Sequence, residues 1–157
     1  MNLRAAARVA LPMAAAAVFL TIAANAVGSV ALDQPGAIRI TDRLVKHTHV
    51  DGGRHGPGAG DFDFYRQLLF NKGITASSIG HSDLTCINTG TGSESCSGTY
   101  FLPTGKIMVA GVIASRLFYE LAVIGGTGNY DNVRGSLTVT FLGGSPAHEF
   151  LIFRLGV

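Results

Sequence analysis

The residues best suited to contact a bound molecule alternate along residues 61–69. Successive side chains of an extended strand point to opposite faces, so every second residue of this segment shares a face. One face then offers hydrogen-bonding groups beside an aromatic ring, and the other is largely apolar. If the strand belongs to a barrel, either face could line the interior, and the alternation alone does not decide which. The polar face consists of Asp61, Asp63, Tyr65 and Gln67; the apolar face holds Phe62, Phe64 and Leu68 beside Arg66.

Two histidines, His47 and His49, also share one face of a predicted strand. Imidazoles at positions i and i+2 can bind one metal ion together, but a metal site needs further ligands. No other residue stands at a spacing that indicates a third ligand, and His55 and His81 lie elsewhere in the sequence. We therefore expect solvent-facing or hydrogen-bonded histidines here, and no metal site.

Cys86 and Cys96 are the only cysteines of the chain. The residues between them are rich in Gly, Ser and Thr, which is typical of a loop between two strands. In an exported protein, such a close pair favours a disulfide, which would stabilise the fold by roughly 2–3 kcal/mol. A metal site with two cysteine ligands is the alternative, but it lacks further ligands at a matching spacing.

The elements that would position these residues are short strands. Runs of β-branched, aromatic and aliphatic residues alternate with turn signals about every 8–12 residues, which is the pattern of an all-β fold. About eight strands in one small domain predict a barrel or a sandwich, and closure into a barrel would remove exposed strand edges. The runs cover residues 38–50, 61–70, 74–87, 99–102, 106–115, 117–124, 135–142 and 148–155.

The first 26 residues have the features of a cleaved signal peptide. Arg4 and Arg8 precede an apolar, alanine-rich stretch over residues 9–24, which ends at Ala24-Asn25-Ala26; Ser29-Val30-Ala31 is a second acceptable cleavage site. The stretch is shorter than the roughly 20 residues of a transmembrane helix, so cleavage is favoured over a retained anchor. We therefore expect a secreted protein with a flexible lead-in over residues 27–36 and one domain over residues 37–157.

Cleavage would also change the charge of the protein. The full chain has 12 Lys and Arg against 10 Asp and Glu, and the two leader arginines would leave while every acid stays. The mature chain would then be formally neutral, so charge alone favours neither nucleic acid nor an anionic membrane as a partner.

The most distinctive part of the sequence runs from Gly98 to Val139. It reads GTYFLPTGKIMVAG over residues 98–111 and LAVIGGTGNYDNVRGSLTV over residues 121–139. These segments resemble the allene oxide cyclase/dirigent superfamily, in particular the bacterial allene oxide cyclase barrel-like proteins. The resemblance extends over about residues 40–155 and includes Gly60-Asp61 and the segment 73–75. Its hallmark positions are Gly125, Gly126, Thr127, Gly128, Tyr130, Arg134 and Gly135.

This resemblance implies a small eight-stranded antiparallel β-barrel with a largely hydrophobic lumen, often assembled as a homotrimer. Cyclases of the family close a fatty-acid epoxide into a cyclopentenone, and dirigent proteins hold reactive intermediates so that coupling follows one stereochemical course. In both cases the ligand supplies the reactivity. The barrel excludes water, fixes a conformer and needs no cofactor.

The family match also assigns candidate site residues. It places Lys46 and Thr48 where the plant cyclases have a lumen-facing Glu and Asn, and Glu120 where they have an aromatic residue. The matched inward positions of the next strand are Asp63, Tyr65 and Gln67. This match makes Lys46, Asp63 and Glu120 candidates for acid and base, and Thr48, Tyr65 and Gln67 candidates to contact the ligand. The alternative is that these are surface residues, or a structural ion pair at a barrel mouth.

Two hypotheses for the function remain. The first is a cofactor-free cyclase or isomerase acting on a hydrophobic small molecule, and the second is a secreted carrier or structural barrel without catalysis. An enzyme should have a pocket of about 300 Å³ or more with at least two convergent polar groups.

Overall fold

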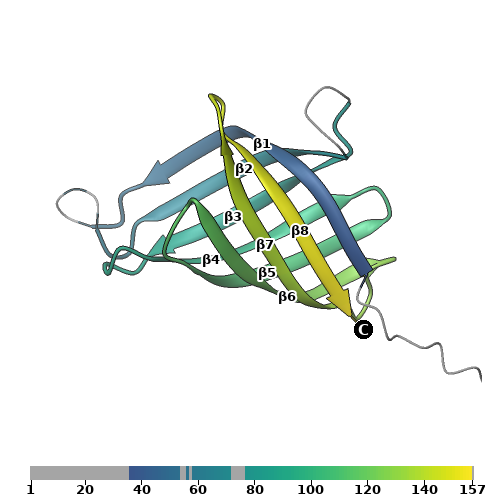
Figure 1. The fold of residues 1–157 in the computed structure, drawn as a ribbon. Helices are drawn as coiled ribbons and strands as arrows, with labels where there is room; N and C mark the ends of the chain where they lie inside the picture. Colours follow the sequence, from purple (N-terminus) through teal and green to yellow (C-terminus); the bar gives the residue numbers. More distant parts are fainter. Residues whose placement is uncertain (1–35, 54–55, 57, 72–76, 157) are drawn as a thin grey trace, which may run out of the picture. The chain divides into compact units, whose positions relative to one another are not determined.

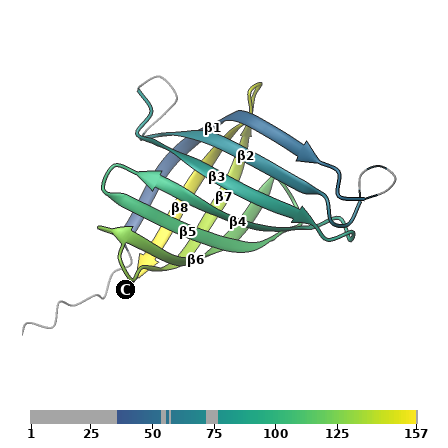
Figure 2. The same ribbon diagram turned by 180° about the vertical axis from the view of Figure 1, so that it is seen from behind.

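The computed structural model describes residues 36–53, 56, 58–71 and 77–156 of the chain. These residues form one closed barrel of eight antiparallel strands, in which each strand pairs with its neighbours in sequence and β1 pairs with β8 (Figures 1 and 2). The predicted all-β, eight-stranded barrel is confirmed. The strands are β1 (Gly36–Val50), β2 (Phe62–Phe70), β3 (Gly80–Asn88), β4 (Glu94–Leu102), β5 (Gly105–Ile113), β6 (Phe118–Gly128), β7 (Arg134–Gly143) and β8 (His148–Gly156).

The expected signal peptide and nearly all of the expected lead-in lie outside the described residues. The part of the chain that is described contains no helix long and apolar enough to cross a membrane.

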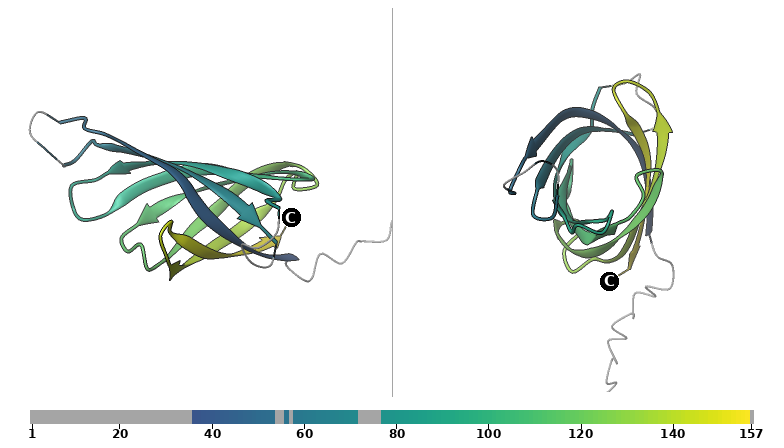
Figure 3. Two further views of the ribbon diagram at one scale, coloured as in Figure 1. Left: turned by 90° about the horizontal axis from the view of Figure 1, so that it is seen from above. Right: turned by 90° about the vertical axis from the view of Figure 1, so that its left-hand side faces the viewer.

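Alternation along the strands fills most of the barrel interior with apolar side chains. The view into the barrel in Figure 3 shows the ring of strands that encloses them. Tyr100 and Phe153 meet edge to face with ring centroids 5.1 Å apart, an arrangement that aromatic pairs favour. Because an interior packed in this way excludes water, it supplies most of the free energy that stabilises the fold. Among the fully buried apolar residues are Leu69, Ile107, Val109, Leu121, Leu137, Val139, Leu151 and Phe153.

The glycines of the family hallmark have a structural role. Gly135 has φ of 143°, and a Cβ atom at this position would collide with the carbonyl oxygen of Arg154 on β8. A Cβ at Gly126 would likewise collide with the carbonyl oxygen of Tyr130. Glycine is therefore required where the β6–β7 connection approaches the neighbouring backbone closely.

A β-bulge at Val45 determines which residues of β1 face the interior. The pairing of β1 with β2 shifts between Leu44 and Lys46, so one extra residue is inserted into β1. Before the bulge, Asp42 and Leu44 face the interior. After it, His47 and His49 lie opposite Tyr65 and Asp63 on the inner face, whereas Lys46 and Thr48 lie on the outer face. An inserted residue reverses the alternation of a strand, which explains this change of face.

The predicted disulfide is confirmed. Cys86 on β3 and Cys96 on β4 are directly paired across the two strands, and their sulfurs are bonded. Both cysteines are buried at the inner face of the barrel.

Candidate functional site

A pocket of about 220 Å³ opens at the end of the barrel where β1, β3, β5 and β7 end. Its walls are partly apolar, and five polar side chains from three strands and one loop reach it. This combination is typical of a ligand pocket, where a few polar groups fix the orientation of an apolar molecule. The pocket is lined by Leu44, Tyr65, Gln67, Leu84, Arg116, Tyr119, Phe141, Ala147 and Glu149.

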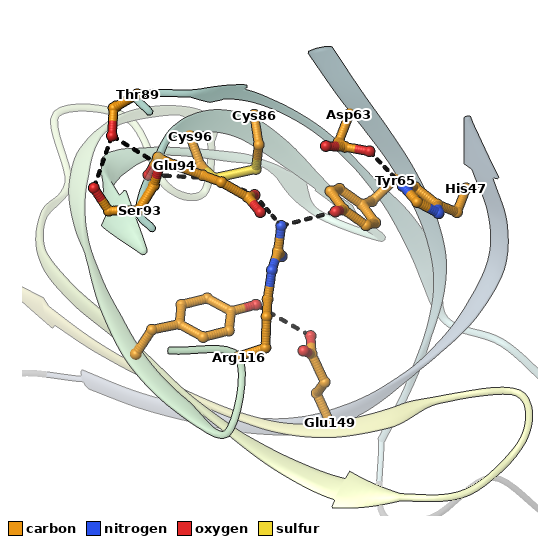
Figure 4. Close-up of a disulfide and its surroundings, with 11 residues drawn as sticks. His47, Asp63, Tyr65, Cys86, Thr89, Ser93, Glu94, Cys96, Arg116 and Glu149 are labelled. Carbon is orange, nitrogen blue, oxygen red and sulfur yellow. Dashed lines mark hydrogen bonds and ion pairs between the residues drawn. A yellow bond between two sulfur atoms is a disulfide. The ribbon is translucent and has the colours of Figure 1, made fainter. Parts of the chain in front are cut away.

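Glu149 is the central polar group of this pocket. It lies near the start of β8, is 8% exposed, and accepts hydrogen bonds from the Gln67 amide at 3.0 Å and the Tyr119 hydroxyl at 3.2 Å. Gln67 is held in turn by the Ser82 hydroxyl, which donates to its amide oxygen at 2.8 Å. Figure 4 shows Glu149 below Arg116 at the barrel mouth. The network fixes the carboxyl group of Glu149 in one orientation toward the pocket.

A second carboxyl group, that of Asp42, lies behind Glu149. The backbone N–H of Glu149 donates to Asp42 Oδ1 at 3.1 Å, while Asp42 Oδ2 is buried without a hydrogen-bond partner among the described residues. Burial, and then the charge of Glu149, raises the pKa of Asp42 from 3.8 to about 9. Burial also raises the pKa of Glu149. Two carboxyl groups in a shared low-dielectric site resist double ionisation, so Asp42 holds a proton at neutral pH.

The hydroxyl groups near this pair stay protonated as well. Burial, and then the charge of Glu149, raises the pKa of Tyr119 above its ordinary value. Burial raises the pKa of Tyr65 to about 12, although the nearby Arg116 guanidinium opposes this shift. Both tyrosines are therefore hydrogen-bond donors at neutral pH.

Arg116 closes one side of the pocket from the loop between β5 and β6. It donates to the Tyr65 hydroxyl at 2.8 Å, pairs with Glu94 on β4, and its guanidinium lies 4.5 Å from the centroid of the Tyr65 ring (Figure 4). It contributes a positive charge next to the carboxyl group of Glu149. An oxyanion that forms on a bound molecule would be stabilised by this charge.

The structure brings only some of the residues proposed from the sequence to the pocket. Tyr65 and Gln67 line it, as expected for residues that contact a ligand. Asp63 lies on the inner face but hydrogen-bonds to His47 and His49 instead.

The side chains of the other candidates lie on the outer face of the barrel. Lys46 and Thr48 line a separate outer hollow of about 390 Å³, because the bulge at Val45 reverses their orientation. Glu120 is exposed, since Tyr119 and Leu121 on either side of it take the inward positions of β6. Lys46, Asp63 and Glu120 therefore do not converge, and the predicted acid–base group does not form from them.

The central residues Glu149, Asp42, Tyr119 and Arg116 were missed from the sequence. A signal for Glu149 was present: it shares the inner face of β8 with Leu151, Phe153 and Leu155, so a carboxylate begins an otherwise apolar face. Asp42 similarly follows Ile38 and Ile40 at two-residue spacing. An isolated carboxylate on an apolar strand face indicates a buried charge that needs a functional or structural partner.

Comparisons with known proteins support the fold. No family model matches the chain, and no curated protein matches its sequence. Among solved structures it is similar to a pyocyanin demethylase, with a TM-score of 0.66 and 23% identity over 76% of this chain and 99% of that one.

Two further solved structures with different named activities are also similar to the chain in fold. A pterocarpan synthase dirigent protein matches with a TM-score of 0.64 and 14% identity over 79% of this chain and 96% of that one. An exo-specific intermolecular Diels–Alderase matches with a TM-score of 0.62 and 14% identity over 78% of this chain and 98% of that one. The chain therefore has the barrel fold of the dirigent proteins and related cyclases, which confirms the resemblance seen in its sequence.

Proposed function

We propose that the lumen pocket binds a small hydrophobic molecule and promotes its cyclisation or isomerisation without a cofactor. The observation that carries this proposal is the Glu149 carboxyl group, buried at the pocket and held by Tyr119 and Gln67. A carboxyl group with a raised pKa in an apolar site is suited to general acid–base catalysis near neutral pH.

In this proposal Glu149 is the base. It takes a proton from one atom of the bound molecule and returns it to another, directly or through the Tyr119 hydroxyl, so no electrons leave the molecule. Asp42 keeps its own proton and reduces the electrostatic cost of a charge on Glu149. Arg116 and the Tyr65 hydroxyl also line the pocket, where they stabilise negative charge that develops on an oxygen.

The pocket volume limits the ligand. Ligand pockets usually have about 300–1,000 Å³, and this pocket, at about 220 Å³, is smaller than the roughly 300 Å³ expected of an enzyme from the sequence. The ligand we propose is therefore a compact molecule of one to three rings. The names of the solved neighbours support a ring-containing ligand, because they refer to pyocyanin, a pterocarpan and Diels–Alder chemistry.

We also propose that the protein is exported and acts outside the cell, as its leader sequence predicts. A structural disulfide between Cys86 and Cys96 supports this, because disulfides persist in oxidising compartments. The homotrimer implied by the family resemblance stays a prediction, which mass photometry or light scattering of the mature protein would test.

The test begins with native mass spectrometry of the protein purified from its own culture, which would reveal a co-purifying ligand. Pyocyanin is the first molecule to test for binding, because its visible absorbance changes with its surroundings and the name of one solved neighbour refers to it. If a ligand is turned over, Glu149→Gln should lower the rate at least 100-fold, which is within the range for loss of a general base. Tyr119→Phe should lower it less.

Glu120→Gln is the matched control, because it changes a glutamate on the outer face of the same barrel. Its rate should stay within twofold of wild type. An unchanged rate in Glu149→Gln would overturn the catalytic assignment. A ligand that binds wild-type protein but is never converted would instead favour the carrier.

A further inference from the structure

A cluster of two imidazoles and two carboxylates lies at the end of β1 and around the start of β2, apart from the residues that line the lumen pocket. Asp63 Oδ1 is 2.6 Å from His47 Nε2 and 3.0 Å from His49 Nδ1. The other ring nitrogen of His49, Nε2, lies 3.8 Å from Asp61 Oδ2. We call His47, His49, Asp61 and Asp63 the rim cluster.

Strand pairing brings these groups together. His47 and His49 are two residues apart and share the inner face of β1, and Asp63 on β2 is the direct partner of His49. Figure 4 shows the imidazole of His47 beside Asp63 and the ring of Tyr65. The His47 ring is stacked on the Tyr65 ring with centroids 4.6 Å apart, which orients the imidazole.

We propose that His47, His49 and Asp63 bind a divalent transition metal ion, such as Zn²⁺, and that Asp61 orients His49. Imidazole nitrogen and carboxylate oxygen are the ligands that Zn²⁺, Co²⁺, Ni²⁺ and Cu²⁺ share in proteins. Three protein ligands leave at least one coordination position for water or another small molecule.

The exposure of the cluster suits reversible binding. The side chains of His47 and His49 are 44% and 41% exposed, so an ion can reach them and their rings can rotate. Tetrahedral ligands at about 2.1 Å from zinc lie about 3.4 Å from one another. The donor atoms of His47, His49 and Asp63 do not all lie within 4.8 Å of one another, so binding requires the ring nitrogens to move away from Asp63 Oδ1 and toward each other. Side chains this exposed can make that movement without repacking of the barrel core.

Asp61 has the features of a residue that positions a metal ligand. It is fully buried, and its carboxylate accepts hydrogen bonds from the backbone N–H groups of Gly52 at 3.0 Å and Gly58 at 2.6 Å. A histidine that binds a metal through one nitrogen commonly faces a carboxylate with the other, which fixes its tautomer and raises its basicity. With Nδ1 on the metal, His49 would direct its Nε2–H toward Asp61.

A different group of potential ligands, Cys86, Glu94 and Cys96, is less suitable. Its two sulfurs are joined in the disulfide and are not thiolate ligands. Of these two clusters, only the rim cluster therefore offers three free donor groups.

Binding is tested with metal-free, untagged mature protein. Isothermal titration with Zn²⁺ should show one ion bound per chain, and Co²⁺ should give the visible absorption of a four- or five-coordinate site. His47→Ala and His49→Ala should each weaken Zn²⁺ binding at least 10-fold, and Asp61→Asn should weaken it roughly 10- to 100-fold. The disulfide content and circular dichroism of each variant check that it is folded.

His81→Ala is the matched control. His81 also lies near a carboxylate, with Nε2 3.9 Å from Asp83 Oδ2, and is similarly exposed at 41%, but it lies outside the rim cluster. This variant and Glu149→Gln should bind Zn²⁺ like wild type, which separates the rim cluster from the proposed lumen chemistry. The proposal is overturned if wild type shows neither Zn²⁺ binding nor a Co²⁺ spectrum. Equal affinity in His47→Ala and His49→Ala, or equal loss in His81→Ala, would overturn it as well.

Discussion

Replacing Asp42 by asparagine tests the buried carboxyl pair through the pH dependence of folding. Asparagine has nearly the shape of protonated aspartic acid. Its Oδ1 can keep the hydrogen bond from the Glu149 backbone N–H, and its amide can donate where the acid proton would. The variant therefore retains the native contacts but cannot ionise when the chain unfolds.

The expected magnitude follows from the raised pKa. Asp42 ionises near 3.8 in the unfolded chain and near 9 in the folded barrel, because burial, and then the charge of Glu149, opposes its ionisation. Between these values the folded protein holds a proton that the unfolded chain has released. The contribution of Asp42 to the free energy of unfolding is thus largest below pH 3.8 and falls as pH rises toward 9, by about 1.4 kcal/mol per pH unit.

From pH 5 to pH 7, this one group should lower the free energy of unfolding of wild type by roughly 3 kcal/mol. The Asp42→Asn variant should lack this contribution, so its stability should depend less on pH and should exceed that of wild type at pH 8. Glu149 has a raised pKa for the same main reason, burial, and contributes a slope of the same sign in both proteins.

The assay is urea unfolding at several pH values with the disulfide intact, followed by far-ultraviolet circular dichroism because the chain has no tryptophan. Asp83→Asn is the control. The salt bridge with Arg66 lowers the pKa of Asp83, so this group is ionised in both states above pH 5 and its removal should leave the slope unchanged. Parallel curves for wild type and Asp42→Asn would refute the reasoning, as would equal flattening in Asp83→Asn.

Three further predictions concern the barrel itself. Replacing Cys86 and Cys96 by serine together should lower the free energy of unfolding by roughly 2–3 kcal/mol, as expected for a separation of 10 residues; an unchanged urea midpoint would contradict this. Tyr100→Phe should raise the free energy of unfolding by about 1 kcal/mol, since the buried hydroxyl has no hydrogen-bond partner among the described residues. A decrease would mean that the hydroxyl makes a hydrogen bond in solution. Gly135→Ala should lower the free energy of unfolding by more than about 2 kcal/mol, because its Cβ would collide with a backbone carbonyl of β8. Gly36→Ala, with open space around it, should leave the free energy of unfolding nearly unchanged in the same titration.

The barrel was predictable from the sequence because its signals are local. Turn residues such as Gly143 and Gly144 have positive φ, and they separate runs that alternate in the way strands require. The cysteine pair also came from local evidence, since the residues between Cys86 and Cys96 form a short loop that returns the chain across two paired strands.

The site was less predictable because it depends on which face of each strand is turned inward. The single extra residue at Val45 exchanges the faces of β1, so that Lys46 and Thr48 turn outward while His47 and His49 turn inward. No periodicity in the sequence marks this bulge. On β6, the family match selected Glu120. The residues of this strand that face inward are instead the alternating apolar ones that include Tyr119.

The buried position of Asp42 and Glu149 in the lumen needs a physical explanation. Asp42 and Glu149 are buried in a barrel whose interior is packed mostly with apolar side chains, and burial raises the pKa of both. Replacing such a pair with well-packed neutral residues commonly stabilises a protein. A fold that retains the pair gives up stability at neutral pH, and a proton-transfer site is a physical reason to do so. If Asp42→Asn is more stable at pH 8 and Glu149→Gln is inactive while folded, the two results together would show that the pair serves the pocket and not the barrel.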